Sequence, residues 1–235
     1  MSQKHSPRQN RLLAALPAEG LKLLEPHLQQ VLLRAGDILS EPDTLPCHAY
    51  FPVDCTLSLY YHMENGETAE TAMIGNEGMF SVATILGGET MPYSATVVTT
   101  GHAFRIARDT LKKILNGTES LRQPLLLYSQ ALLTQMEQTA GCGRHHSLEQ
   151  QLCLHLLQLH DSSLSDEFEL THEALAHMLG VRREGITKAA KKLRDAGLID
   201  YRRGHIRILD RKGLDGMSCE CYEVVRKEFK RLLGY

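Results

Sequence analysis

Residues 169–208 carry the pattern that most limits how this chain can fold: two short helical segments, each ended by a glycine, followed by a hairpin. Thr171 is placed to cap the first helix, because its side-chain oxygen can accept a hydrogen bond from a free backbone N–H. Gly180 ends that helix, because glycine enters the left-handed conformation at little cost. A second helix is predicted over 182–196, and residues 199–207 then form two short strands joined by a tight turn. This order predicts a helix-turn-helix with a β-hairpin wing.

Positive charge gathers on this stretch, although the whole chain has a formal net charge of −2. Between residues 171 and 212 there are eleven Lys or Arg against five Asp or Glu. The side of the second helix opposite its apolar positions carries Arg182, Arg183, Thr187, Lys188, Lys191 and Lys192. Such a cluster of basic residues is typical of a surface that binds the phosphates of DNA. The alternative is a merely solvated helix in a small helical domain.

The rest of the chain divides by its pattern of apolar residues and turns. Over about 31–107, short apolar runs alternate with Gly, Pro and Asp or Asn turns, which is typical of an antiparallel β-barrel or β-roll. Short helices are expected before it and helices over 109–116, 119–139, 148–160 and 213–233 after it. We therefore expect an α+β fold with an N-terminal antiparallel β-roll (a double-stranded β-helix), a long dimerisation helix and a winged helix-turn-helix. The expected parts are a β-roll domain with N-terminal helices (1–117), the dimerisation helix (118–140), a hinge (141–146) and the winged helix-turn-helix domain (147–235).

The long helix is expected to pair two copies of the chain. Its apolar residues recur at three- and four-residue steps, which suits a coiled-coil contact. The predicted dimer interface is Leu121, Leu125, Tyr128, Leu132 and Met136. The alternative is that this strip covers the β-roll, a task that Leu126, Leu127 and Leu133 could also perform from another face. The glycines of Gly141-Cys142-Gly143 are expected to break the helix and form the hinge.

No apolar run approaches the roughly 20 residues that span a bilayer. The N-terminus also lacks the apolar core of a signal peptide. We therefore expect a cytoplasmic protein whose cysteines are reduced thiols.

The order of β-roll, long helix, hinge and winged helix-turn-helix resembles the Crp/Fnr family of bacterial transcription regulators, over roughly residues 12–233. The most specific part is VRREGITKAAKKLRDAGLI, and the ending MSCECYEVVRKEFKRLLG resembles a subgroup whose ligand is unassigned. The resemblance implies a cyclic-nucleotide-binding-like β-roll and a homodimer on a near-palindromic site of double-stranded DNA. It implies no enzyme activity and no cofactor. It allows RNA polymerase and an unassigned small-molecule effector as further partners.

The resemblance also implies roles for single residues of the second helix. Arg183, Glu184 and Lys188 match the positions with which the family contacts bases. Arg can bond both acceptors of a guanine edge, Glu can accept from a cytosine amino group, and Lys is a less selective donor. Phosphate contacts, which position the protein without specifying sequence, are then expected from Arg182, Thr187, Lys191, Lys192, Arg202 and Arg203.

The expected effector pocket consists of the turn Gly75, Asn76, Glu77 and Gly78 together with Tyr93 and Ser94. Members of the family that bind cyclic AMP offer an Arg-Ser pair after a Gly-Glu turn. Here Ser94 is retained, but Tyr93 stands in place of the arginine and Asn76 in place of the carboxylate. A buried phosphate without a cation has lost its main partner. We therefore expect no, or very weak, cyclic AMP binding.

Metal, redox and enzyme functions have weaker support in the sequence. A family-type iron–sulfur cluster needs cysteines near the N-terminus, but the first cysteine is Cys47. Cys219 and Cys221 would point to different faces of a helix, so we expect no metal ligands, and Cys142 is the thiol to test for oxidation. The histidines at 145, 146, 155 and 160 are expected to be solvated or core residues. The alternative function is a cupin-like ligand- or metal-binding β-roll protein or enzyme, for which the roll offers only His48, His62 and His102.

Overall fold

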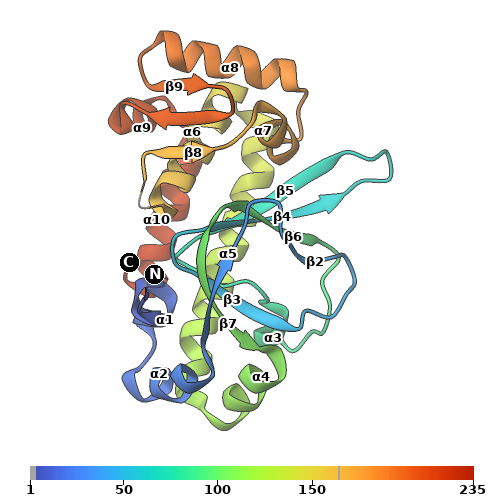
Figure 1. The fold of residues 1–235 in the computed structure, drawn as a ribbon, viewed down its shortest axis with the longest axis vertical. Coiled ribbons are helices and arrows are strands. Elements are labelled where there is room, and N and C mark those ends of the chain that lie inside the picture. Colours follow the sequence, from blue (N-terminus) through green and yellow to red (C-terminus); the bar gives the residue numbers. More distant parts are fainter. Residues whose placement is uncertain (1–3, 164) are drawn as a thin grey trace.

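The computed structural model describes residues 4–163 and 165–235 and has the predicted α+β order of elements. Figure 1 shows a β-roll beside a long helix, with a small C-terminal domain at one end of the molecule. The N-terminal segment forms η1 (Pro7–Gln9), α1 (Arg11–Ala15), α2 (Ala18–Leu24) and η2 (Glu25–His27). Asn10 fixes this segment to the roll, because it caps α1 and donates to the carbonyls of Pro52 (2.8 Å) and Gly78 (2.9 Å). The short helices expected before the roll are confirmed, and α2 begins directly after Pro17.

The β-roll consists of two antiparallel sheets with the strand orders β1-β7-β3 and β2-β6-β4-β5. The turn between Met63 and Thr68 joins β4 to β5. Apolar side chains such as Phe51, Leu59 and Ile74 fill the space between the sheets. The elements are β1 (Gln29–Leu33), β2 (Ile38–Ser40), β3 (His48–Pro52), β4 (Thr56–His62), β5 (Thr68–Ile74), α3 (Ala83–Leu86), β6 (Ser94–Thr99) and β7 (Gly101–Ala107).

Two helices follow the roll, α4 (Arg108–Gly117) and α5 (Glu119–His145). Figure 1 shows α5 running behind the roll along the long axis of the molecule, up to the C-terminal domain. Tyr128 anchors α5 to the roll, because its buried hydroxyl donates to the carbonyl of Met79 at 2.9 Å.

The prediction that α5 breaks at Gly141 is wrong, since the helix continues through Gly143 to His145. Each glycine weakens a helix by about 0.5–1 kcal/mol. The side chain of Cys142 lies between the two glycines and is 4% exposed, so tertiary packing holds the turn helical. Ser147 then caps the next helix in a reciprocal hydrogen-bond pair with Gln150. A hinge role for residues 141–146 stays a prediction.

The C-terminal domain has its own core, to which α6, α7, α8 and a three-stranded antiparallel sheet of order β8-β10-β9 contribute. Its elements are α6 (Leu148–Ser162), β8 (Glu167–Glu169), α7 (His172–Leu179), α8 (Arg183–Asp195), β9 (Ile199–Arg202), β10 (His205–Ile208), α9 (Arg211–Met217) and α10 (Glu220–Leu233). The single last helix predicted over 213–233 is therefore two helices, separated at Ser218 and Cys219. Among the described residues, no helix has the length and apolar character needed to cross a membrane.

Candidate nucleic-acid interface

The helix-turn-helix is built as its sequence predicts. The side chain of Thr171 accepts the N–H of Ala174 at 3.0 Å and so caps α7. Gly180 ends α7 with φ 61°, a left-handed conformation that favours glycine. Ile186 and Leu193, both 0% exposed, hold α8 against the domain core. Because one side of α8 is buried, the orientation of its other side is fixed.

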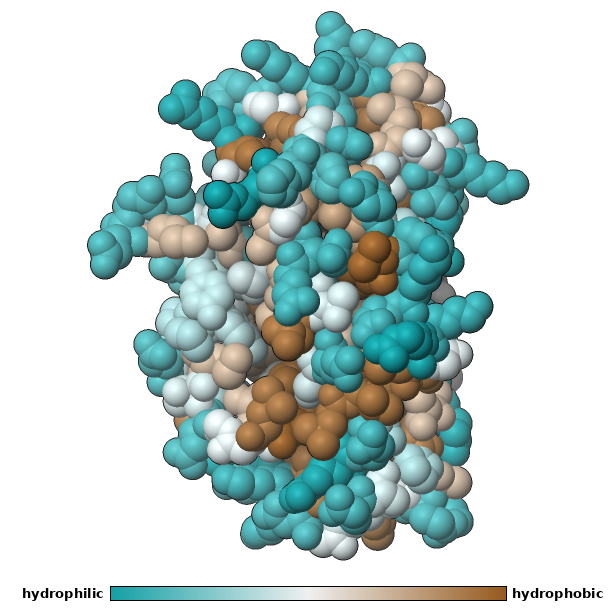
Figure 2. All heavy atoms as spheres, turned by 180° about the vertical axis from the view of Figure 1, so that it is seen from behind, coloured by the Kyte–Doolittle hydropathy of each residue, from teal (hydrophilic) through white to brown (hydrophobic). Residues whose placement is uncertain are grey.

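The exposed side of α8 carries the predicted base-contacting residues Arg183, Glu184 and Lys188. Figure 1 shows α8 at the end of the molecule farthest from α4, and Figure 2 shows mainly hydrophilic surface at that end. The side chain of Arg183 forms a long ion pair of 4.0 Å with Glu173, and both side chains are exposed. Within residues 4–163 and 165–235, Lys188 has no ion-pair partner. These side chains are therefore available to an external ligand.

Two of the predicted phosphate-contacting residues of α8 are engaged elsewhere. Lys192 pairs with the carboxylate of Glu149 on α6, and this hydrogen bond holds the pKa of Glu149 below its usual range. The hydroxyl of Thr187 donates to the carbonyl of Arg183 at 3.1 Å and lies 3.0 Å from His172 Nδ1. The exposed side chains of Arg182 and Lys191 lack ion-pair partners within the described part of the chain.

The wing is a tight hairpin whose turn carries the predicted Arg202 and Arg203. Arg203 has φ 49° and Gly204 has φ 86°, as a two-residue hairpin turn of type I′ requires. Arg202 forms an exposed 3.2 Å ion pair with Asp200, whereas the exposed Arg203 has no ion-pair partner among the described residues. The wing therefore adds positive charge beside α8.

Sequence reasoning missed His172, which joins the wing to α8. Its ring stacks on Tyr201 of β9 at 4.0 Å between centroids, with an interplanar angle of 15°. Burial, together with the charge of Arg183, lowers the pKa of His172. A neutral ring at physiological pH stacks without adding charge to the interface. Only the fold could reveal this contact, because the partners lie far apart in sequence.

The predicted effector pocket divides into two places. In the turn, the Glu77 carboxylate accepts the N–H of Gly75 at 2.8 Å, and burial raises the pKa of Glu77. A Cβ on Gly78 would lie 2.4 Å from the hydroxyl oxygen of Tyr128, so the turn is packed against α5. Tyr93 is 3% exposed, and burial raises its pKa to about 12.

Ser94, the next residue, bonds His62 Nε2 at 2.9 Å. Neither Tyr93 nor Ser94 lines the cavity that borders Glu77. Tyr93 and Ser94 thus belong to the filled interior of the roll rather than to one pocket with the turn.

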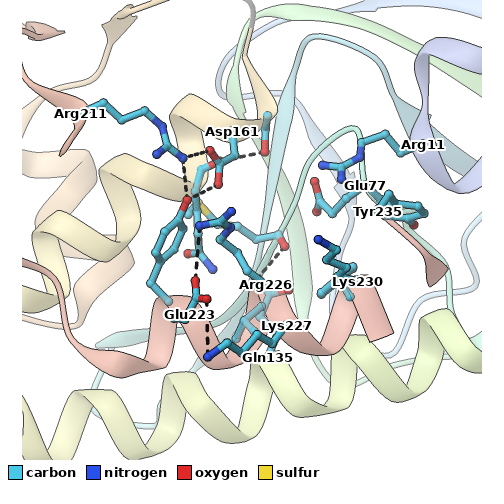
Figure 3. Close-up of a pocket in the computed structure, with 16 residues that line it drawn as sticks. Arg11, Glu77, Gln135, Asp161, Arg211, Glu223, Arg226, Lys227, Lys230 and Tyr235 are labelled. Carbon is cyan, nitrogen blue, oxygen red and sulfur yellow. Dashed lines mark hydrogen bonds and ion pairs between the residues drawn. The ribbon is translucent and has the colours of Figure 1, made fainter. Parts of the chain in front are cut away.

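The cavity of about 460 Å³ beside Glu77 lies between the roll, the end of α6 and α10. Figure 3 shows Arg11, Glu77 and Tyr235 at one end of it, and Arg211 and Asp161 at the other. Arg211 donates to Asp161 at 2.5 Å. The charged residues in its lining are Arg11, Glu77, Asp161, Arg211, Glu223, Arg226, Lys227 and Lys230. Sequence reasoning placed only Glu77 here, because the other charged residues come from the N-terminal segment, α6, α9 and α10, which are distant from Glu77 in sequence.

Most of the predicted dimer interface faces the core of its own chain. Leu121, Leu125, Tyr128 and Leu132 are at most 3% exposed and pack into the core of their own chain, and Met136 packs against that core. The side with exposed apolar residues carries Leu126, 40% exposed, and Leu133, 56% exposed. Figure 2, seen from behind, shows an apolar patch on the lower half of the molecule. The regular strip on α5 therefore covers the roll.

Comparisons with known proteins agree with this arrangement. Residues 150–217 match the Crp-like helix-turn-helix domain, and residues 30–118 match the cyclic nucleotide-binding domain. FixK2 from Bradyrhizobium japonicum is 14% identical, with a TM-score of 0.68 over 82% of this chain and 98% of that chain. A CRP-family transcriptional regulator from Thermus thermophilus is 14% identical, with a TM-score of 0.66 over 80% of this chain and 96% of that chain.

A second regulator from that organism, of the CRP/FNR family, is 24% identical, with a TM-score of 0.56 over 81% of this chain and 98% of that chain. These likenesses show the fold. No curated protein matches in sequence.

A β-roll of this kind, followed by a long helix and a DNA-binding winged helix-turn-helix, defines a class of two-domain transcription regulators. The two matched domains, in this order, cover more than half of the chain. The chain belongs to the Crp/Fnr family, whose members regulate transcription and are not enzymes.

Proposed function

We propose that two copies of this chain bind a near-palindromic DNA site in the cytoplasm and place one α8 each in successive major grooves. The supporting observation is the exposed basic side of α8, which buried residues on its other side hold in a fixed orientation. An α-helix fits the major groove, where each base pair presents a distinct pattern of donors and acceptors. On a two-fold axis, the half-sites would lie about one helical turn apart.

The proposed base contacts come from Arg183, Glu184 and Lys188, which are exposed on the first turns of α8. The weak 4.0 Å pairing with Glu173 leaves the Arg183 guanidinium free to bond a guanine edge. Glu184 is an acceptor suited to a cytosine amino group, and it repels phosphate, so it favours correct register.

The proposed phosphate contacts come from Arg182, Lys191 and Arg203. These exposed cations flank the base-contacting residues on the helix and on the wing. Lys192 would have to leave Glu149 before it could contact DNA. Thr187 orients the first turn of α8 through its bond to the Arg183 carbonyl.

The proposed dimer contact uses the solvent side of α5 and retains only Met136 of the interface predicted from the sequence. Leu126 and Leu133 are seven residues apart, which keeps them on one face of a helix paired in a coiled coil. Ser129, Met136 and Ala140 occupy the intervening and following positions of this seam and are half-buried or exposed. The small residues toward its C-terminal end would let two helices approach closely.

The proposed sensor domain does not take cyclic AMP. Tyr93 stands where the cyclic-AMP-binding members have an arginine, and it is packed edge-on against Tyr61 at 6.1 Å between ring centroids. A phosphate placed there would lose its water without gaining a cation. The effector, if the roll takes one, therefore has different chemistry.

The three histidines that the sequence offers for the cupin-like alternative are not brought together. Among the described residues, His48, His62 and His102 do not form one cluster: His62 bonds Ser94, whereas His102 lies 3.4 Å from Asp54.

Selection of preferred duplexes from a random pool tests the proposal. The purified chain should enrich one near-palindromic sequence. Arg183→Ala should lose about 1–3 kcal/mol of binding and relax the preference at one position of each half-site. Lys191→Ala should weaken binding to all sequences alike and reduce its salt dependence. Lys22→Ala, a change of an exposed lysine on α2, is the charge-matched control and should bind as the wild type does. Enrichment of no sequence, or unchanged preference in Arg183→Ala, would contradict the proposal.

A further inference from the structure

Three cysteines and a histidine meet where α5 ends and α10 begins. Cys142 lies in the last turn of α5, and His146 follows at its C-terminal cap. Cys219 is the N-terminal cap of α10, and Cys221 lies in the first turn of that helix. The four ligand atoms, three Sγ and one imidazole nitrogen, all lie within 4.8 Å of one another.

The sequence predicts no metal site here, but the structure differs from that prediction in two local features. The sequence predicts Cys219 and Cys221 in one helix, where residues two apart face different ways. Cys219 is extended instead, with φ −90° and ψ 166°, so the two thiols can approach the same point. The sequence also predicts Cys142 in a hinge, whereas α5 continues through this residue and buries its side chain.

The spacing of the four atoms fits a single tetrahedral ion. Cys142 Sγ lies 3.5 Å from Cys219 Sγ, and Cys221 Sγ lies 3.6 Å from His146 Nδ1. Zinc binds thiolates at about 2.3 Å and imidazole at about 2.0–2.1 Å, so its tetrahedral ligands lie about 3.5–3.8 Å apart. Small adjustments of side-chain torsions would therefore complete the site.

The far side of the imidazole has the partner that a metal-bound histidine normally has. His146 Nε2 lies 3.3 Å from the carboxylate of Glu220. A proton on Nε2, held by this carboxylate, leaves the lone pair of Nδ1 directed at the cysteines. Such carboxylate–histidine pairs fix the tautomer and raise the basicity of the ligand.

The surroundings favour metal binding. The three cysteines are 4–5% exposed, and Cys219 and Cys221 lie at the positive N-terminal end of α10, which stabilises thiolates on a bound cation.

We propose that Cys142, His146, Cys219 and Cys221 bind one Zn²⁺ ion in a closed tetrahedral site. Three thiolates and one imidazole are a ligand set that suits zinc, and four protein ligands leave no position for a substrate. On binding, the three thiols release their protons to solvent. The ion ties the end of α5 to the start of α10, a helix that packs back along α5 through Phe229 and Tyr128, whose ring centroids are 6.3 Å apart. Zinc thus fixes the DNA-binding domain to the helix that precedes it.

Elemental analysis of the full chain, purified under reducing conditions, is the first test. The wild type should contain about one zinc per chain. A chelator should remove the zinc and lower the thermal unfolding midpoint. Cobalt added to the stripped protein should give the visible absorption of tetrahedral, thiolate-bound Co²⁺.

Cys219→Ser and His146→Gln should lose the zinc and the cobalt absorption, and the midpoint of each variant should no longer respond to the chelator. Glu220→Gln should retain the stoichiometry but bind zinc about 10–100-fold more weakly. Cys153→Ala, which removes a buried thiol of the same core outside the four ligands, should bind zinc as the wild type does.

Several outcomes would overturn the proposal. A reduced wild type without zinc and without cobalt absorption would do so, as would full zinc content in Cys219→Ser. Preferential binding of another metal would refute the choice of ion. If the cysteine variant failed to fold, Glu220→Gln and the stripped wild type would still decide the matter. DNA binding does not enter these measurements, so they stand apart from the test of α8.

Discussion

A buried ion pair between the β-roll and the DNA-binding domain should make the free energy of unfolding depend on pH. Glu70 of β5 and His155 of α6 lie 2.8 Å apart, with side chains 3% and 7% exposed. Ser58 donates a 2.5 Å hydrogen bond to the other carboxylate oxygen. The opposite nitrogen of the imidazole, Nδ1, lies 3.0 Å from the carbonyl of Gln151, so it carries a proton. A neutral ring would then turn the lone pair of Nε2 toward the carboxylate.

Burial alone would lower the pKa of His155, but the hydrogen bond and charge of Glu70, with the Gln151 carbonyl, outweigh burial and raise it. A raised folded-state pKa means that the pair's contribution to stability is fully present below the unfolded pKa of about 6.5. The contribution is lost as pH rises through the higher folded value.

Glu70→Ala leaves a buried imidazole and a buried hydroxyl without their partner. Removing one member of a buried pair costs about 3–5 kcal/mol. Glu70→Gln can accept from Ser58 and donate to Nε2 of a neutral His155, so it should cost far less. Its stability should also depend less on pH.

Urea unfolding of the wild type and both variants between pH 6 and 9 measures these free energies. The wild type should lose its advantage over Glu70→Gln as pH rises. A loss below about 1 kcal/mol in Glu70→Ala, or parallel pH profiles for wild type and Glu70→Gln, would refute the reasoning.

Three further predictions concern assembly, the effector and the packing of the turn. Leu126→Glu with Leu133→Glu should shift the chain from dimer to monomer in analytical ultracentrifugation; an unchanged dimer would contradict the proposed seam. Calorimetric titration with cyclic AMP should give no heat of specific binding, and micromolar affinity would prove the reasoning about the roll wrong. Gly78→Ala should destabilise the chain by about 1–3 kcal/mol, because the new methyl group meets Tyr128. Gly117→Ala, where a Cβ meets nothing within 4 Å, is the control and should cost nothing in thermal denaturation.

The sequence predicted those features whose causes lie within a few residues. The cap at Thr171 and the stop at Gly180 each depend on one side chain or one backbone conformation, and both are confirmed. The buried side of α8 follows from spacing within one helix. The exposed residues of the DNA-binding face could therefore be named in advance.

Features that depend on the partner of a surface could not be predicted in this way. The periodic strip on α5 shows that something covers it, but not whether a second copy or the chain's own roll does so. The chain's own roll covers the strip, and the hydrogen bond from Tyr128 to the Met79 carbonyl shows how closely α5 packs against the roll. The cysteine cluster could not be predicted for a related reason, since Cys142 and Cys219 are distant in sequence and no local spacing rule joins them.

Three of the contacts between the DNA-binding domain and the rest of the chain bear on how α8 is oriented. The hydroxyl of Thr68 on β5 donates to the carbonyl of His177 in α7 at 3.0 Å. Glu70, two residues along the same strand, holds α6 through His155, and the cysteine cluster joins α5 to α10. A ligand shifts the angle of α8 only if it binds two arrangements of these contacts with different affinity. Because the interior of the roll is filled with apolar side chains, whereas the charged cavity borders both α6 and α10, a ligand in the cavity would contact the DNA-binding domain directly. The junction, rather than the roll's interior, is therefore where regulation of DNA binding is best sought.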